Sequence, residues 1–237
     1  MNFVAPGGIR IDPAGQPDTR KSYRRGTHRI VPPGETVSRF VRYASDLGIT
    51  RLANVTGLDY LGIPVFMAVR PNARSLSVSQ GKGLDNDAAS ASAFMEAVES
   101  EHAERIERPM KMASYAALKE EAFVAAPGQL PRATRTRLQP DYKIPWIEGR
   151  DIASAESIWV PFELVHADFR KPSLAGTGFF ATSSNGLASG NHRLEAICHG
   201  ICEAIERDAT RLHDGDHVSR YHDGSGPDRV ANERSDK

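Results

Sequence analysis

Five glutamates on two candidate helices are the residues of this sequence whose types and spacing could do chemistry. The segment GNHRLEAICHGICEAIERDA, residues 190–209, carries Glu195, Glu203 and Glu206. At about 100° per residue, these acids and Asn191 fall on one side of a helix. Four aliphatic residues fall on the other side: Leu194, Ile197, Ile201 and Ile205. The segment is therefore predicted to be an amphipathic helix with one acidic face.

A second candidate helix, residues 87–108, repeats this design. Ser92, Glu96 and Glu99 form a narrow polar stripe along it. Its sequence MEAVES is also similar, letter by letter, to CEAIER in the first helix. The two segments together suggest an internal duplication.

Basic residues near these acids help to distinguish a solvent-facing stripe from a stripe that binds a metal ion. A solvated helix face usually places Lys or Arg four residues after Glu, as Glu101, expected to face outward, does with Arg105. Of the five stripe acids, only Glu203 has such a partner, Arg207. Carboxylates gathered without bases repel one another, and Mg²⁺, which prefers oxygen ligands, would remove that repulsion. Spacing alone leaves open both a magnesium site and two ordinary solvent-facing stripes.

The two segments resemble the YcaO family, whose members use ATP to activate backbone amides of peptides and proteins. The resemblance covers roughly residues 27–210 and rests on the motifs S-x-x-x-E-x-x-E and N-x-x-x-E-x₇-E-x-x-E-R. It implies that the acids hold Mg²⁺ against the phosphates of ATP. The implied nucleotide site comprises Ser92, Glu96, Glu99, Asn191, Glu195, Glu203 and Glu206. The implied metal ligands are Glu96, Glu99, Glu195, Glu203 and Glu206.

The resemblance also implies a reaction and its partners. A nucleophile adds to the amide carbonyl of a peptide or protein substrate, and phosphorylation of the amide oxygen then gives an azoline or a thioamide. No catalytic side chain is assigned, because the enzyme's task is to position ATP and offset charge. Residues 53–71 resemble members encoded beside a TfuA-like partner. A TfuA-like or leader-binding protein and a second copy of the chain are therefore the expected protein partners.

The sequence departs from the family pattern in two places. Glu99 is followed by Ser100 where the family often has Glu-Arg, and the resemblance stops near Thr210 although family members continue well beyond it. The chain therefore resembles a family member truncated at its C-terminus. This leaves an alternative function, a non-catalytic fragment or partner-binding module without turnover.

Lys82 in QGKG, residues 80–83, is a candidate phosphate contact, because its flanking glycines permit close backbone approach. The segment does not have the spacing of a P-loop. An exposed lysine in a turn is the alternative interpretation.

Two further groups of residues admit a functional interpretation and a simpler one. A zinc cluster would need more than the two ligands that one helix presents, and solvent-facing histidines beside small apolar cysteines are the alternative. A basic cluster near the N-terminus is either part of a solvated arm or a contact for an acidic leader peptide or partner. The zinc candidates are His192, Cys198, His199 and Cys202, and the basic cluster is Arg20, Lys21, Arg24 and Arg25.

The elements that position these residues predict an α/β fold of mixed sheets flanked by helices, with the two acidic helices adjacent across a cleft. We expect a loose arm at 1–27, a partial YcaO-like nucleotide-binding domain at 28–210 and a disordered tail at 211–237. Besides the acidic helices, we expect helices at 33–48 and 113–125, strands at 51–55, 63–70 and 75–79, and two strands in WIEGRDIA and SIWVPFELVHAD. A surface connection at 130–145 and a loop at 182–191 complete the expected order.

Composition limits the remaining classes. The 237 residues include 30 Lys and Arg and 30 Asp and Glu, so no global field recruits nucleic acid or an anionic membrane. The longest apolar run, IPVFMAV, is too short to span a bilayer, and the N-terminal segment has no apolar core of a secretion signal. Two cysteines do not make a disulfide framework. We expect a protein of the reducing cytoplasm.

Overall fold

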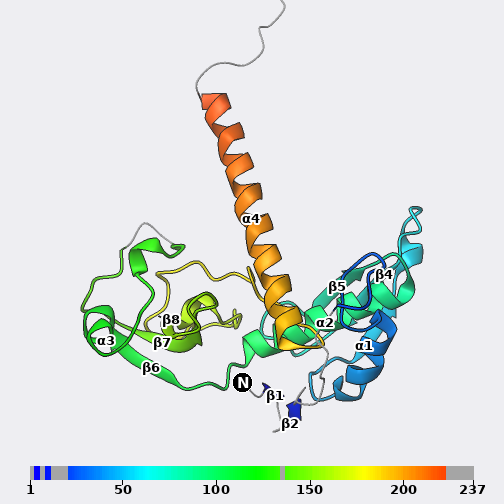
Figure 1. Ribbon diagram of the computed structural model, residues 1–237, viewed down its shortest axis with the longest axis horizontal. Helices are drawn as coiled ribbons and strands as arrows, with labels where there is room; N and C mark the ends of the chain where they lie inside the picture. The colour runs from blue at the N-terminus through cyan, green and yellow to red at the C-terminus, as the bar shows by residue number, and fades with distance from the viewer. Residues whose placement is uncertain (1–2, 6–8, 12–20, 134–136, 223–237) are drawn as a thin grey trace, which may run out of the picture.

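The computed structural model describes residues 3–5, 9–11, 21–133 and 137–222 of the chain. Two three-stranded sheets, each with its own helices, lie on either side of the base of a long helix, α4 (Figure 1). All strand pairs within the two sheets are antiparallel. This arrangement of small sheets and helices confirms the expected α/β class.

The first sheet supports one of the two acidic helices. Its strand order is β3 (Arg51–Asn54), β4 (Val65–Val69) and β5 (Val78–Lys82). Helices α1 (Pro33–Phe40) and α2 (Asn86–Glu104) pack together, and α2 lies against β4 and β5. The expected helix at 33–48 is therefore shorter, because α1 passes into a single 3₁₀ turn before the chain reaches β3.

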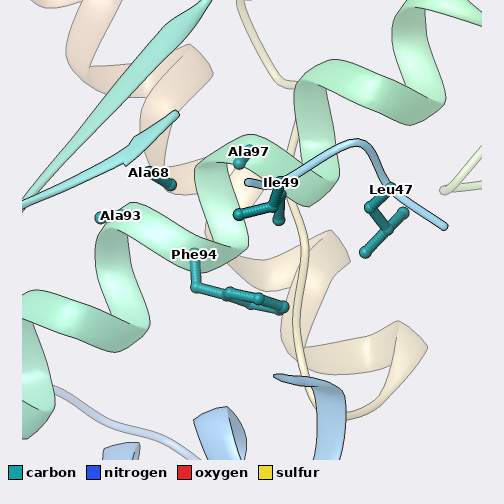
Figure 2. Close-up of a cluster of buried hydrophobic side chains, with 6 residues drawn as sticks. All are labelled: Leu47, Ile49, Ala68, Ala93, Phe94 and Ala97. Atoms are coloured by element: carbon teal, nitrogen blue, oxygen red, sulfur yellow. The ribbon is translucent and has the colours of Figure 1, made fainter. Parts of the chain in front are cut away.

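Small residues let α2 lie close to this sheet. The core between them contains Ala68 on β4 and three residues of α2, Ala93, Phe94 and Ala97, together with Leu47 and Ile49 (Figure 2). A Cβ atom on Gly81 would lie 2.1 Å from the backbone nitrogen of Ala93, so no larger residue fits there. This close approach explains why β5 continues through QGK, where the sequence predicted the strand to end at Ser79.

The second sheet has the strand order β6 (Met110–Ser114), β7 (Lys143–Arg150) and β8 (Ser157–Pro161). Helix α3 (Tyr115–Glu121) begins where β6 ends, and the Ser114 hydroxyl accepts a hydrogen bond from the N–H of Ala117. The helix expected at 113–125 therefore starts as a strand and is shorter. The buried centre of this sheet consists of Ala113, Leu118, Val124, Ile144, Trp146 and Phe180.

Helix α4 (Arg193–His222) is the second acidic helix, and in Figure 1 it projects away from both sheets. No helix or strand among the described elements packs extensively along it. Its helical backbone continues beyond Thr210, so the segment expected to be disordered from residue 211 begins as helix. Residues 223–237 lie outside the described part of the chain.

The N-terminal arm also contains regular backbone. Strands β1 (Phe3–Ala5) and β2 (Ile9–Ile11) form a two-stranded antiparallel sheet, whereas the sequence predicted no element there. Further along, Tyr23 and Arg29 pair in an isolated bridge. The 3₁₀ turns of the chain are η1 (Val41–Tyr43), η2 (Thr56–Leu58), η3 (Pro127–Gln129) and η4 (Phe162–Leu164). Within the described residues, no helix has the length and apolar character that a membrane span requires.

Candidate functional site

The polar stripe of α2 faces away from the core of the first sheet. Asp85 begins the helix by accepting a hydrogen bond from the N–H of Ala88 at 2.9 Å. Because Phe94 and its neighbours occupy the opposite face, Ser92 and Glu96 are exposed and Glu99 is half-buried. Packing of α2 thus orients the stripe that the sequence predicted.

Glu99 is the point where α2 meets the loop before α4. Its Oε1 atom accepts hydrogen bonds from the backbone N–H of Ser189 at 2.8 Å and from the Ser189 hydroxyl at 2.6 Å. Burial raises the pKa of Glu99; the bonds from Ser189 oppose that rise, while the charges of Glu96 and Glu203 add to it. The structure therefore brings acids from both helices into electrostatic range of one another.

Lys82, at the end of β5, faces the same stripe. Burial raises the pKa of Glu96, and a backbone hydrogen bond from Gln80 and the positive charge of Lys82 oppose that rise. Lys82 itself is exposed. Lys82 therefore lies at the end of a strand, within electrostatic range of Glu96, and not in an isolated turn.

Glu203 holds the other end of the loop. Its carboxylate accepts a hydrogen bond from the N–H of Gly186 at 3.2 Å and lies 3.5 Å from the guanidinium of Arg207. Gly186 has a φ of +77°, and its carbonyl oxygen would lie 2.7 Å from a Cβ atom on Gly200, so a glycine at each position permits this approach. The loop is thereby fixed to α4 through Glu203 and to α2 through Glu99.

Glu195 lies deeper than the other acids, with 2% of its surface exposed. Its carboxylate accepts hydrogen bonds from the N–H of Ile30 at 2.8 Å and from both nitrogens of Asn191, and Arg29 lies 3.6 Å away. Asn191 also donates to the Thr36 hydroxyl at 3.0 Å. Glu195 therefore anchors the first turn of α4 to the segment that precedes α1.

Asn191 contributes an unusual atom to this region. Only 8% of its surface is exposed, and its side-chain oxygen Oδ1 is buried without a hydrogen-bond donor in the described part of the chain. An unpaired buried carbonyl oxygen is unfavourable unless something else binds it. This oxygen is available as a ligand to a cation.

The predicted site residues thus divide into two neighbouring groups. Glu96, Glu99, Glu203 and Lys82 form one, and Asn191 and Glu195 form the other. Burial and the charge of Arg29 lower the pKa of His199, while the charges of Glu203 and Glu195 act in the opposite direction. Ser92 and Glu206 are exposed at the ends of the two stripes.

The acidic side chains do not form a metal cage. Among the described residues, no group of three or more His, Cys, Asp or Glu side chains is close enough to hold a metal ion. The candidate zinc ligands are therefore not brought together, and the glutamates of the two groups do not form a closed ligand shell.

A cavity of about 490 Å³ lies beside the buried group, between residues 21–29 and the first turns of α4. Lys21, Arg24 and Arg29 line it on one side. Cys198, His199 and Cys202 line it on the other. The basic cluster was evident in the sequence, but its position opposite α4 was not. Arg20, the first residue of that cluster, lies outside the described residues.

One prediction about charge pairing is wrong. Glu101, expected to face outward, is buried, as is Glu104, and both form ion pairs with the buried Arg70. Burial acts to raise the pKa of Glu104, but hydrogen bonds from Arg70, Arg74 and Ser75 outweigh it, so the pKa is lowered. The expected pair between Glu101 and Arg105 is present at 2.7 Å. Glu104 also binds the turn at 74–75, and α2 ends at Glu104, four residues before the predicted end at residue 108.

Comparison with known proteins gives a consistent result. The YcaO family model, described as a cyclodehydratase that binds ATP and Mg²⁺, matches residues 80–223, the range that contains both acidic helices. A protein of Rhizobium leguminosarum bv. trifolii, named for its place in the tfuA 3′ region, is 44% identical over 188 residues. A protein of Methanothermobacter thermautotrophicus is 38% identical over 192 residues. The alignments cover 78% of this chain but only 43% and 47% of these relatives.

Two solved structures share the fold. The YcaO protein of Methanopyrus kandleri, bound with AMPPCP and Mg²⁺, matches with a TM-score of 0.65 and 27% identity, over 84% of this chain and 49% of that one. A heterocyclase in complex with substrate and cofactor matches with a TM-score of 0.61 and 23% identity, over 74% and 27% of the two chains. The chain thus spans less than half the length of the proteins that it resembles.

Proposed function

The chain belongs to the YcaO family, and we propose that its described residues form the nucleotide-binding part of an enzyme that uses ATP and Mg²⁺ to activate an amide of a peptide or protein. The observation that carries the proposal is that Glu99 of α2 and Glu203 of α4 bind the same loop, through Ser189 and Gly186, although the two helices are far apart in the sequence. Such a gathering of carboxylates is unfavourable unless a cation offsets it.

The residue types present, carboxylates and one side-chain amide, are those that bind a magnesium ion. Burial raises the pKa of both Glu96 and Glu99, and a divalent cation would favour their charged forms. The unpaired Oδ1 of Asn191 is a neutral oxygen ligand of the kind that Mg²⁺ accepts. The residues that would hold the metal are Glu96, Glu99, Glu195, Glu203 and Glu206, with Asn191 and Ser92 beside them.

Cations of the chain would hold the phosphates. Lys82 faces the α2 acids, and Arg29 lies beside Glu195, so basic side chains flank the acidic groups on both sides. Magnesium between them would neutralise charge on the phosphate oxygens. The protein residues bind and orient, and none is assigned as a nucleophile or as a general base.

The proposed reaction is the phosphorylation of an amide oxygen. Addition of a nucleophile to the amide carbonyl carbon places negative charge on its oxygen. Transfer of the γ-phosphoryl group to that oxygen then makes phosphate the leaving group, and its loss leaves an azoline or a thioamide according to the nucleophile. The TfuA-like partner belongs to the same proposal, supported by the name of the Rhizobium relative.

A second candidate is supported by the exposure of α4. Leu194, Ile201 and Ile205 expose 52%, 40% and 64% of their surface, although the helix is amphipathic. Such a stripe normally packs against another element. A chain with this face uncovered would be a non-catalytic fragment or partner-binding module, and we expect weak or no ATPase activity from the 237 residues alone.

Isothermal titration calorimetry with ATP tests the leading proposal. We expect binding that requires Mg²⁺ and that is lost in Glu96→Ala and in Glu203→Ala, one variant on each helix. Glu120→Ala, an exposed acid on α3 outside the site, is the matched control and should bind like the parent chain. Unchanged binding in both site variants would overturn the magnesium site. Robust ATP hydrolysis dependent on peptide, by this chain alone, would overturn the second candidate.

A further inference from the structure

The cavity between residues 21–29 and α4 combines positive charge with two thiols. Lys21, Arg24 and Arg29 line it, and Cys198 and Cys202 are both exposed to it, one turn apart on α4. These cysteines have no role in the proposed phosphoryl transfer. Their position in a cavity of about 490 Å³ gives room for a small ligand beside the sulfur atoms.

The two cysteines differ in their surroundings. The ammonium group of Lys21 lies 3.3 Å from the Sγ atom of Cys198 and donates a hydrogen bond to it. No hydrogen bond or ion pair to the sulfur of Cys202 occurs in the described part of the chain. Cys198 is therefore the candidate reactive thiol, and Cys202, on the same helix, serves as the reference for its reactivity.

The charges around the cavity favour anions. Among the described residues that line it, Glu195 is the one carboxylate, and that group is already bound by Arg29 and by the N–H of Ile30. Because burial lowers the pKa of His199, this side chain adds little positive charge at neutral pH. Lys21 and Arg24 are left to attract an incoming negative ligand. A cavity lined by one sign of charge raises the local concentration of the opposite ions.

We propose that Cys198 is a modification site for small anionic disulfides of the glutathione disulfide class. The Cys198 thiolate attacks one sulfur of the disulfide, a new S–S bond forms at Sγ, and the old S–S bond breaks. The displaced thiolate leaves and takes a proton from solvent. Cys198 is oxidised to the mixed disulfide, and half of the reagent is reduced to thiol, so no other oxidant is needed.

This modification would control the neighbouring site. The adduct lies in the cavity that Arg29 and Glu195 also line, and its carboxylates would pair with Arg29, one of the two cations proposed to hold phosphate. ATP and the adduct would then exclude each other. This second step rests on the proposed function, whereas the selective reaction of Cys198 does not.

Labelling kinetics followed by intact mass spectrometry test the reaction itself. The probes are anionic 5,5′-dithiobis(2-nitrobenzoate), neutral 2-hydroxyethyl disulfide and cationic cystamine, applied to Cys202→Ser and Cys198→Ser chains at low salt. With the anionic probe we expect Cys198 to react about tenfold faster than Cys202, and we expect this advantage to shrink with cystamine and in high salt. Equal rates at both cysteines with every probe would overturn the proposal.

The double variant Lys21→Gln, Arg24→Gln separates the effect of the cavity's positive charge from the effect of the solvent accessibility of Cys198. It removes two cations from the cavity and leaves the two sulfur atoms in place. We expect the preference of Cys198 for the anionic probe to disappear while its rate with the neutral probe stays within about twofold. A preference that persists in this variant would contradict the assigned role of the cations.

Calorimetry with ATP and Mg²⁺ then tests the link to the nucleotide. We expect the glutathione adduct of Cys198 to weaken binding at least about tenfold and dithiothreitol to restore it. ATP binding that the adduct leaves unchanged would overturn the exclusion but not the selective labelling. Failure of the unlabelled chain to bind ATP would overturn the proposed function, while the labelling result would stand by itself.

Discussion

Helices α2 and α4 carry the same kind of acidic stripe, yet they are held in different ways. Helix α2 packs against α1, β4 and β5, and its core face is closed by Phe94 and by alanines that meet Gly81. Helix α4 is fixed mainly through Glu195 and Glu203 near its base and projects from the two sheets (Figure 1).

The difference shows what each half of the site depends on. Glu96 and Glu99 are positioned mainly by the packed core between α2 and the first sheet. The place of Glu203 depends on the anchor at Glu195 and on the loop at 182–191. A metal between the two helices would therefore bind acids of α2, which a packed core holds, and acids of α4, which polar contacts hold. We expect substitutions that disturb α4 to affect the proposed site more than substitutions on the surface of α2.

The largest effect expected from this comparison comes from Arg70. Arg70→Met removes the buried cation that Glu101 and Glu104 share and leaves Glu101 only the exposed Arg105 as a partner. Breaking a buried ion pair costs roughly 3–5 kcal/mol of the free energy of unfolding. Arg207→Met on α4 removes an exposed partner of Glu203 and should cost roughly 0–1 kcal/mol. Urea unfolding measures both. Similar losses in the two variants would show that α2 is not the more firmly held helix.

A smaller effect is expected from the anchor of α4. Glu195→Gln removes the charge that Arg29 and the N–H of Ile30 bind, and losing a hydrogen bond to a charged group costs about 1.5–3 kcal/mol. Because this contact fixes the first turn of α4, backbone amides at 193–200 should exchange with deuterium faster. Glu206→Gln, at an exposed position of the same helix, is the control. If both variants exchange alike, Glu195 is not the anchor.

The sequence predicted the acidic stripes because they depend on helical periodicity, a local property. It also found β3 and β4 and the loop at 182–191 within a few residues. What it missed depends on contacts distant in the chain. Arg70 reaches Glu101 and Glu104 across 31 and 34 positions, and no helical spacing reveals that pair.

The same limit explains the errors at the site. The basic residues at 21–29 meet α4 in space, a contact separated by 177 positions between Lys21 and Cys198. The continuation of β5 through Gly81 is unexpected from propensity, because glycine usually weakens a strand. It becomes intelligible once the backbone of Ala93 is seen 2.1 Å from where a Cβ would lie. Glu195, one of five similar acids in the sequence, is distinguished only by its burial.

The smallest expected effect concerns the pH dependence of stability at Glu99. Burial raises the pKa of Glu99 above its ordinary value of 4.5, with the charges of Glu96 and Glu203 adding to the rise. The folded chain therefore binds this proton more tightly than the unfolded chain, and stability falls as the pH rises from 4.5 through the folded-state pKa. Glu99→Gln keeps an oxygen that accepts from Ser189 but removes the charge. It should match the parent chain at pH values below 4.5 and be more stable at neutral pH.

Adding Mg²⁺ should reduce the difference in stability between the parent chain and Glu99→Gln at neutral pH. A cation bound at the stripe would stabilise the charged carboxylate, so Mg²⁺ should raise the thermal midpoint of the parent chain at neutral pH and leave that of Glu99→Gln nearly unchanged. Thermal unfolding at a series of pH values, with and without Mg²⁺, measures both effects, and Glu120→Gln controls for the loss of one surface charge. A Glu99→Gln chain that is less stable than its parent at neutral pH would mean that the charge is already offset within the protein. In that case the site between α2 and α4 would be complete without a metal.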